Sequence, residues 1–149
     1  MFERQGKIVA VCISAGGIPR WPVHTACLTI GGLLEDGHRF KEHYQPNRAV
    51  TLFSLEQLQA FAKGASPFPP GSVGENLTVQ GLNLGALAPG VRLQIGETEV
   101  QLEKPWTPCH AQHAETGTTQ PNSEQHKGFF ASVTREGTIR TGDAIAVVW

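Results

Sequence analysis

Cys109 is the side chain in this sequence best suited to chemistry. It stands in the segment PWTPCH, where Pro105 and Pro108 remove backbone donors and fix the local geometry. We therefore expect Cys109 to lie in a stiff loop, where reactive side chains are often held. A thiolate is a soft nucleophile and metal ligand, and a cation at His110 or Lys104 near the sulfur would lower the thiol pKa from its usual value of about 8.5. The competing interpretation is an incidental loop thiol.

Three histidines that follow Cys109 raise the possibility of zinc binding. His110, His113 and His126 supply nitrogen ligands that could join the thiolate around one zinc ion. The pattern C-H-x-x-H has no second cysteine nearby, and such a pair is what makes structural zinc spacing specific. Solvated loop histidines are the alternative interpretation.

The other two cysteines have a different predicted role. Cys12 and Cys27 each lie in an apolar, strand-like run, where cysteine behaves as a small buried hydrophobe. We therefore expect both to resist alkylation until the protein unfolds. The 3 cysteines of the chain show no disulfide framework spacing, which is typical of reduced thiols and favours a cytoplasmic location.

A glycine-rich turn is a candidate binding region. The run PPGSVGENLTVQGLNL, residues 69–84, places Gly74, Glu75 and Asn76 just ahead of a predicted strand. Glycine allows a ligand to approach the backbone closely, and exposed amides in such a turn bind anions. The alternative is a tight turn in which Asn76 satisfies its own backbone. The run lacks the lysine and the following Ser or Thr of a phosphate-binding P-loop, which excludes that type of nucleotide site.

A charged segment, EDGHRFKEHYQPNRAV (35–50), is a further candidate. It carries His38, Lys41 and Arg48 ahead of another predicted strand. Arg48 at the strand entrance would be placed for a bidentate contact with a phosphate or a carboxylate. A solvated charged turn is the competing interpretation for most of these residues.

Length, charge and hydropathy restrict the class of protein. The 149 residues fit one domain, residues 1–149, with a continuous core. Lys and Arg total 12 against 13 Asp and Glu, so no excess of positive charge favours nucleic acid or an acidic membrane as a partner. No apolar run has the length of a membrane span or the flanks of a signal peptide, so we expect a soluble, unexported protein.

Strand-like segments dominate the chain. They occupy residues 6–14, 24–30, 48–53, 75–80, 91–95, 98–103, 129–134 and 144–149. This spacing predicts a mainly β domain with a few short helices, closed into a barrel or folded into a sandwich. Gly96-Glu97 and Glu136-Gly137 are each expected to connect an antiparallel hairpin.

One helix interrupts the strands. Ser54 and Gln57 form a capping box, and Gly64 ends the apolar face that follows it. That face consists of Leu55, Leu58, Phe61 and Ala62. We expect it to cover an opening or a side of the barrel, with loops over residues 64–74 and 110–128.

Taken together, these stretches resemble the MOSC domain, a module of molybdenum cofactor sulfurases that also occurs as free-standing bacterial proteins. The resemblance depends on the order of six short motifs, GLLEDGHR, NRAVTLFSLE, GSVGENLTVQGLNL, GVRLQIG, PWTPCH and RTGDAIAV. It spans nearly the whole chain. It implies a closed β-barrel with a few short helices, in agreement with the strand pattern.

The chain departs from the family pattern at two places. Many free-standing members have His-Gly-Gly-Pro-Asp where this chain has HYQPN, so Tyr44, Gln45 and Asn47 replace two glycines and a carboxylate. Members often carry an arginine before Pro-Cys, where Thr107 stands here. Both changes would reshape an anion site.

The resemblance implies a function centred on Cys109, which matches the cysteine that the family uses to bind molybdenum or to carry sulfur as a persulfide. It also implies contacts with the molybdenum cofactor from Arg48, His38, Lys41, Gly74, Glu75, Asn76 and His110. Relatives that hold the cofactor reduce N-hydroxylated compounds. Alternatives are a non-catalytic sulfur or cofactor carrier and a zinc-stabilised binding module.

Electrons for such a reduction would have to come from another protein. The chain has no four-cysteine iron–sulfur spacing and no G-x-G-x-x-G after a strand, so we expect neither a cluster nor a flavin or nicotinamide. The pyridoxal phosphate domain of the sulfurases is also missing from this short sequence. A separate reductase partner is therefore expected beside the small-molecule substrate.

Overall fold

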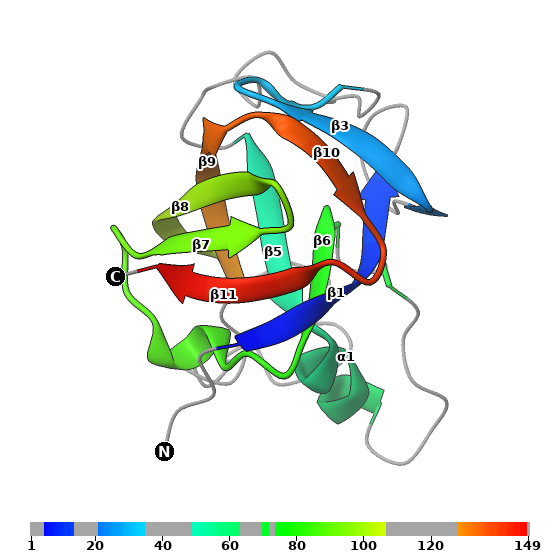
Figure 1. Ribbon diagram of the computed structural model, residues 1–149. Coiled ribbons are helices and arrows are strands. Elements are labelled where there is room, and N and C mark those ends of the chain that lie inside the picture. Colours follow the sequence, from blue (N-terminus) through cyan, green and yellow to red (C-terminus); the bar gives the residue numbers. More distant parts are fainter. Residues whose placement is uncertain are drawn as a thin grey trace.

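A closed β-barrel of seven strands forms the centre of the computed structural model (Figure 1), which describes residues 5–13, 21–34, 49–62, 70–71, 74–106 and 128–148. In hydrogen-bonded order the strands are β11 (Ala144–Val148), β7 (Arg92–Ile95), β8 (Thr98–Trp106), β9 (Gly128–Arg135), β5 (Val50–Ser54), β6 (Leu77–Gln80) and β1 (Gln5–Ile13). β1 pairs back onto β11, with Gln5 opposite Ala146, which closes the ring. All neighbours are antiparallel except β5 and β6. The predicted mainly β barrel is confirmed.

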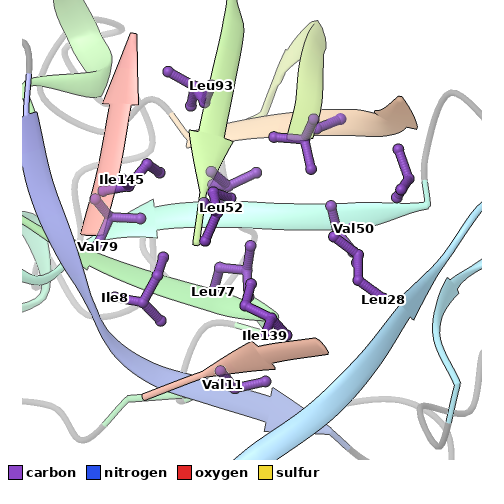
Figure 2. Close-up of a cluster of buried hydrophobic side chains, with 14 of the residues drawn as sticks. Ile8, Val11, Leu28, Val50, Leu52, Leu77, Val79, Leu93, Ile139 and Ile145 are labelled. Atoms are coloured by element: carbon purple, nitrogen blue, oxygen red, sulfur yellow. The ribbon is translucent and has the colours of Figure 1, made fainter. Parts of the chain in front are cut away.

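Alternating burial explains why these strands enclose a core. In β8, Thr98, Val100 and Leu102 are buried and the residues between them are partly exposed. Successive side chains of a strand point to opposite faces of the sheet, so every second residue fills the barrel. Figure 2 shows the resulting cluster, which includes Ile8, Val11, Leu52, Leu77, Val79, Leu93 and Ile145. Full burial of one such side chain stabilises the fold by about 1.5–3 kcal/mol.

A second, three-stranded sheet lies against the barrel. It has the order β10 (Gly137–Arg140), β3 (Thr25–Thr29) and β4 (Gly32–Leu33), and β3 and β10 lie side by side in Figure 1. A short strand, β2 (Trp21–Val23), pairs with the end of β1. Ile139 of β10 and Leu28 of β3 are both buried in the barrel's own core cluster, so one apolar core joins the two sheets.

The first predicted hairpin is confirmed. β7 and β8 pair antiparallel, with Ile95 opposite Thr98 across the two-residue connection. Gly96 in this connection has a φ of 57°, in the left-handed region that glycine adopts without a Cβ penalty.

The second predicted hairpin is wrong. The chain leaves β9 at Arg135, and β10 pairs with β3 instead of folding back on β9. Two carboxylates bond to the backbone of the second sheet and so hold the chain there after β9. Glu136 Oε2 accepts a hydrogen bond of 2.8 Å from the backbone N–H of Ile30, and Glu97 Oε2 accepts one of 3.0 Å from that of Thr138.

The described part of the chain contains one α-helix, α1 (Leu55–Ala62), at one end of the barrel (Figure 1). Ser54 Oγ accepts a hydrogen bond of 3.2 Å from the backbone N–H of Gln57, which is one half of the predicted capping box. The return bond is absent among the described residues, since the buried Gln57 Oε1 accepts no hydrogen bond there. Leu58 is fully buried beneath the helix. Glu56 Oε2 accepts a bond of 3.0 Å from the backbone N–H of Gly81, which fixes the helix to the turn after β6.

Among the described residues no helix is long and apolar enough to cross a membrane.

The two cysteines of the described strands differ in exposure. Cys12 in β1 is fully buried, as expected. Cys27 in β3 is exposed, and the expectation that it is buried is wrong. The reason is the register of β3, in which Ala26 and Leu28 face the core and Cys27 between them must face solvent.

This difference predicts a selective alkylation pattern. Iodoacetamide is expected to modify Cys27 in the native protein and to reach Cys12 only when denaturant exposes the core. Peptide mapping by mass spectrometry measures both adducts, and Cys27→Ser removes the native-state adduct as a control. Equal native-state rates at Cys12 and Cys27 would contradict the burial described here.

Candidate functional site

Most of the predicted site residues lie outside the described residues, and their roles stay predictions. These residues are His38, Lys41, Arg48, Cys109 and His110, together with the zinc candidates His113 and His126. The structure describes the other three, Gly74, Glu75 and Asn76, and it describes the strand end that leads toward Cys109.

The glycine-rich run forms the tight turn expected from its sequence. Gly71 and Gly74 have φ angles of 89° and 91°, and the backbone N–H of Gly74 donates to Gly71 O over 3.1 Å. A residue with a Cβ would be strained at either position. Both glycines are buried. The turn leads directly into β6.

Glu75 places a carboxylate inside the protein at this turn, with 0% exposure. Its Oε2 accepts a hydrogen bond of 3.0 Å from the backbone N–H of Gly71 and one of 2.8 Å from Thr78 Oγ1. Hydrogen bonds of this kind are what make a buried carboxylate tolerable. Glu75 therefore holds the turn against the first residues of β6.

Asn76 joins two strands of the barrel and is 1% exposed. Its Oδ1 accepts a hydrogen bond of 3.0 Å from the backbone N–H of Thr51 in β5, and its Nδ2 donates one of 3.2 Å to Cys12 O in β1. Its own backbone N–H donates to Thr51 Oγ1 over 2.9 Å. The side chain thus bonds to the backbone of neighbouring strands, whereas the tight-turn interpretation had it bond to its own backbone.

β8 extends further toward Cys109 than the sequence predicted. The expected strand ended at residue 103, whereas β8 runs to Trp106 and includes Pro105, which lies opposite Phe129. Within the described residues β7 pairs with β8 only as far as Gln101, so Pro105, which has no N–H to donate, lies beyond the part of β8 that has a strand on both sides.

Three aromatic rings gather where β8 ends. The ring centroids of Trp106 and Phe53 are 6.0 Å apart with planes at 77°, and those of Trp106 and Phe130 are 5.8 Å apart at 47°. The edge-to-face arrangement of Trp106 and Phe53 is one of the favourable geometries for aromatic pairs. We call Phe53, Trp106 and Phe130 the aromatic clasp. Trp106 also lies opposite Gly128, the first residue of β9.

The turn and the clasp both contact β5, at residues two positions apart. Asn76 bonds to Thr51 near the start of this strand, whereas Trp106 packs on Phe53 near its end. Among the described residues no group of three or more His, Cys, Asp or Glu side chains could hold a metal ion.

The sequence did not indicate the roles of three residues around these features. Thr51 bonds to Asn76, Trp106 packs in the aromatic clasp, and Gly128 lies opposite Trp106. Thr51 could not have been found, because its partner Asn76 is 25 residues away and neither residue alone indicates the pair. Trp106 offered a signal, since an aromatic residue stands close to Cys109 in the sequence.

Comparison with known proteins places this fold among related sequences and structures. The sequence model described as the MOSC domain matches residues 39–146. A search of curated protein sequences gives no match.

Solved structures share the fold. The YuaD protein from Bacillus subtilis is 20% identical, with a TM-score of 0.73 over 99% of this chain and 98% of that chain. YiiM from Geobacillus stearothermophilus is 22% identical, with a TM-score of 0.73 over 97% of this chain and 75% of that chain. YiiM from Escherichia coli is 20% identical, with a TM-score of 0.67 over 96% of this chain and 70% of that chain. At these identities the likeness shows the fold alone.

Proposed function

This chain belongs to the MOSC domain family, and on that premise we propose that it binds the molybdenum cofactor as the oxidoreductase component of a system that reduces N-hydroxylated compounds. The observation that supports the proposal most is the position of Cys109. It is the one cysteine within residues 39–146, the range matched by the family model. A soft thiolate suits the sulfur-rich coordination of a dithiolene-held metal.

Cys109 has the central role in this proposal. Its thiolate would hold the metal, and the bound cofactor would supply a two-electron redox centre. Reduction of an N-hydroxylated compound consumes two electrons and two protons, breaks the N–O bond and releases water. The electrons come from a separate reductase partner, and we place both proteins in the cytoplasm.

The remaining site residues have supporting roles in the proposal. Arg48, His38, Lys41 and His110 would contact the anionic groups of the cofactor, since cationic and hydrogen-bonding side chains recognise phosphate. Glu75 and Asn76 would act through the turn that they hold, because both side chains are buried and bonded within the protein. Gly74 lets the backbone take the shape of that turn.

Elemental analysis of the protein, purified from a host that makes the cofactor, tests the proposal. We expect about one molybdenum per chain, together with reduction of an N-hydroxylated compound when an electron donor is added. Protein with transferable sulfane sulfur and no metal would identify a sulfur carrier and contradict the proposal. Stoichiometric zinc without molybdenum would contradict it in favour of a zinc-stabilised module.

A further inference from the structure

β10 is an edge strand of the second sheet, and carboxylates occupy its outer edge. The backbone N–H of Thr138 donates to Glu97 Oε2 over 3.0 Å, and that of Arg140 donates to Asp143 Oδ2 over 2.8 Å. In an antiparallel pair, successive residues direct their backbone groups alternately toward the partner strand and away from it. Thr138 and Arg140 are the residues of β10 whose N–H groups point away from β3. Both of these donors are therefore bonded to a carboxylate.

Two glycines leave room for these carboxylates. A Cβ at Gly137 would lie 2.8 Å from Glu97 Oε2 and 2.9 Å from Glu97 Cγ. A Cβ at Gly96 would lie 2.7 Å from Asp143 Oδ2. The Glu97 side chain thus crosses β10 at a position that has no side chain of its own. It comes from the turn between β7 and β8, so the barrel sheet supplies the acceptor for the edge of the second sheet.

The outer edge of β10 lies at the surface of the protein. Glu97 and Arg140 are exposed, and Thr138 is partly exposed. A strand edge with free N–H groups can pair with a strand of another chain. Two copies of β10 related by a twofold axis would pair antiparallel, and Thr138 could then exchange two hydrogen bonds with Thr138 of the second copy. The bond to Glu97 takes the donor that this pairing requires.

We propose that Glu97 caps the outer edge of β10 and so prevents β10 from pairing with the same strand of a second copy of this chain. The cap has two parts, the carboxylate that accepts the Thr138 N–H and the glycine at position 137 that leaves space for it. The bond between Arg140 and Asp143 and the length of only 4 residues restrict pairing at the same edge. The inference concerns the second sheet and does not depend on the proposed function.

Amide hydrogen exchange of Thr138, followed by NMR at low protein concentration, measures the cap. Glu97→Ala is expected to raise the exchange rate of this amide at least about tenfold, because a hydrogen bond to a charged acceptor is lost. Gly137→Ala should do the same, since its Cβ approaches only the flexible Glu97 side chain within 3.0 Å. Glu97→Gln retains an acceptor oxygen and should keep the wild-type rate. Glu99→Ala is the matched control, because Glu99 bonds to Thr134 Oγ1 and its loss frees no backbone N–H.

Sedimentation equilibrium over a range of protein concentrations measures the pairing. Glu97→Ala is expected to gain mass relative to wild type as the concentration rises, and its Thr138 amide should regain protection over the same range. Thr138→Pro in the Glu97→Ala background removes the N–H and should restore the wild-type mass. Glu97→Gln and Glu99→Ala should show the wild-type mass throughout.

The possible results decide the role of Glu97. A folded Glu97→Ala protein with the wild-type mass at every concentration would overturn the proposal, and so would a gain in mass that Thr138→Pro does not remove. An equal gain in Glu97→Gln would also overturn it, because the charge of Glu97 and not its hydrogen bond would then be responsible. If Glu97→Ala does not fold, the mass and the Thr138 exchange rate of Gly137→Ala decide the question in the same way.

Discussion

Replacing Cys109 by serine is expected to abolish molybdenum binding while the barrel stays folded. A serine hydroxyl is a harder and less polarisable ligand than a thiolate, and it cannot accept sulfane sulfur. Loss of a group that only orients a metal ligand costs about 10–100-fold in affinity, so loss of the ligand itself should cost at least as much. Molybdenum per chain, measured beside a thermal melt, checks both parts. Full molybdenum and full reductive activity in Cys109→Ser would remove Cys109 from the proposed function.

Cys12→Ser is the matched control for this experiment. Cys12 is fully buried in β1, between Val11 and Ile13 of the core cluster, so the new hydroxyl is buried as well. The expected cost is about 1–3 kcal/mol in the free energy of unfolding if the hydroxyl finds no hydrogen-bond acceptor. The folded fraction of Cys12→Ser should retain its molybdenum. The same chemical change thus separates a loss of metal from a loss of stability.

The fold could be predicted from the sequence where runs of strand-forming residues are bounded by turn residues. The segments that became β1, β7, β8 and β9 were all placed within a few residues. Burial alternates in β7 and in most of β8, whereas β1 ends in four consecutive buried residues. β2 and β4 have 3 and 2 residues, too few to show a period. β10 was not predicted, and the hairpin expected at Glu136-Gly137 was wrong, because the sequence does not reveal that Glu136 and Glu97 bond to the second sheet.

The candidate site was less predictable than the fold. The motif order identified the family, since short patterns in a fixed order can be recognised without coordinates. The role of Cys109 stays a prediction, because Cys109 lies outside the described residues. The hydrogen bonds of the Asn76 side chain could not be predicted, because its partners Thr51 and Cys12 are 25 and 64 residues away in the sequence. The exposure of Cys27 could not be predicted either. An apolar run indicates a strand, but the exposed position within it depends on which neighbours face the core.

Asn76 is at the centre of a buried polar network whose loss should have a large effect on stability. Its side chain bonds to Thr51 N and Cys12 O, and the backbone N–H of Cys12 donates to Asn76 O over 2.6 Å. β5, β6 and β1 are thereby joined at one point of the barrel. A backbone group that is buried and deprived of its partner costs about 1–3 kcal/mol.

Asn76→Ala is therefore expected to lower the free energy of unfolding by at least about 2 kcal/mol, because it takes an acceptor from Thr51 N and a donor from Cys12 O at once. Urea titration measures the change. Asn83→Ala is the matched control, since Asn83 is exposed and its Oδ1 accepts one cap bond of 3.1 Å from Gly85 N. Its loss should cost about 1 kcal/mol or less. Equal costs for the two variants would mean that the buried amide does not hold the three strands together.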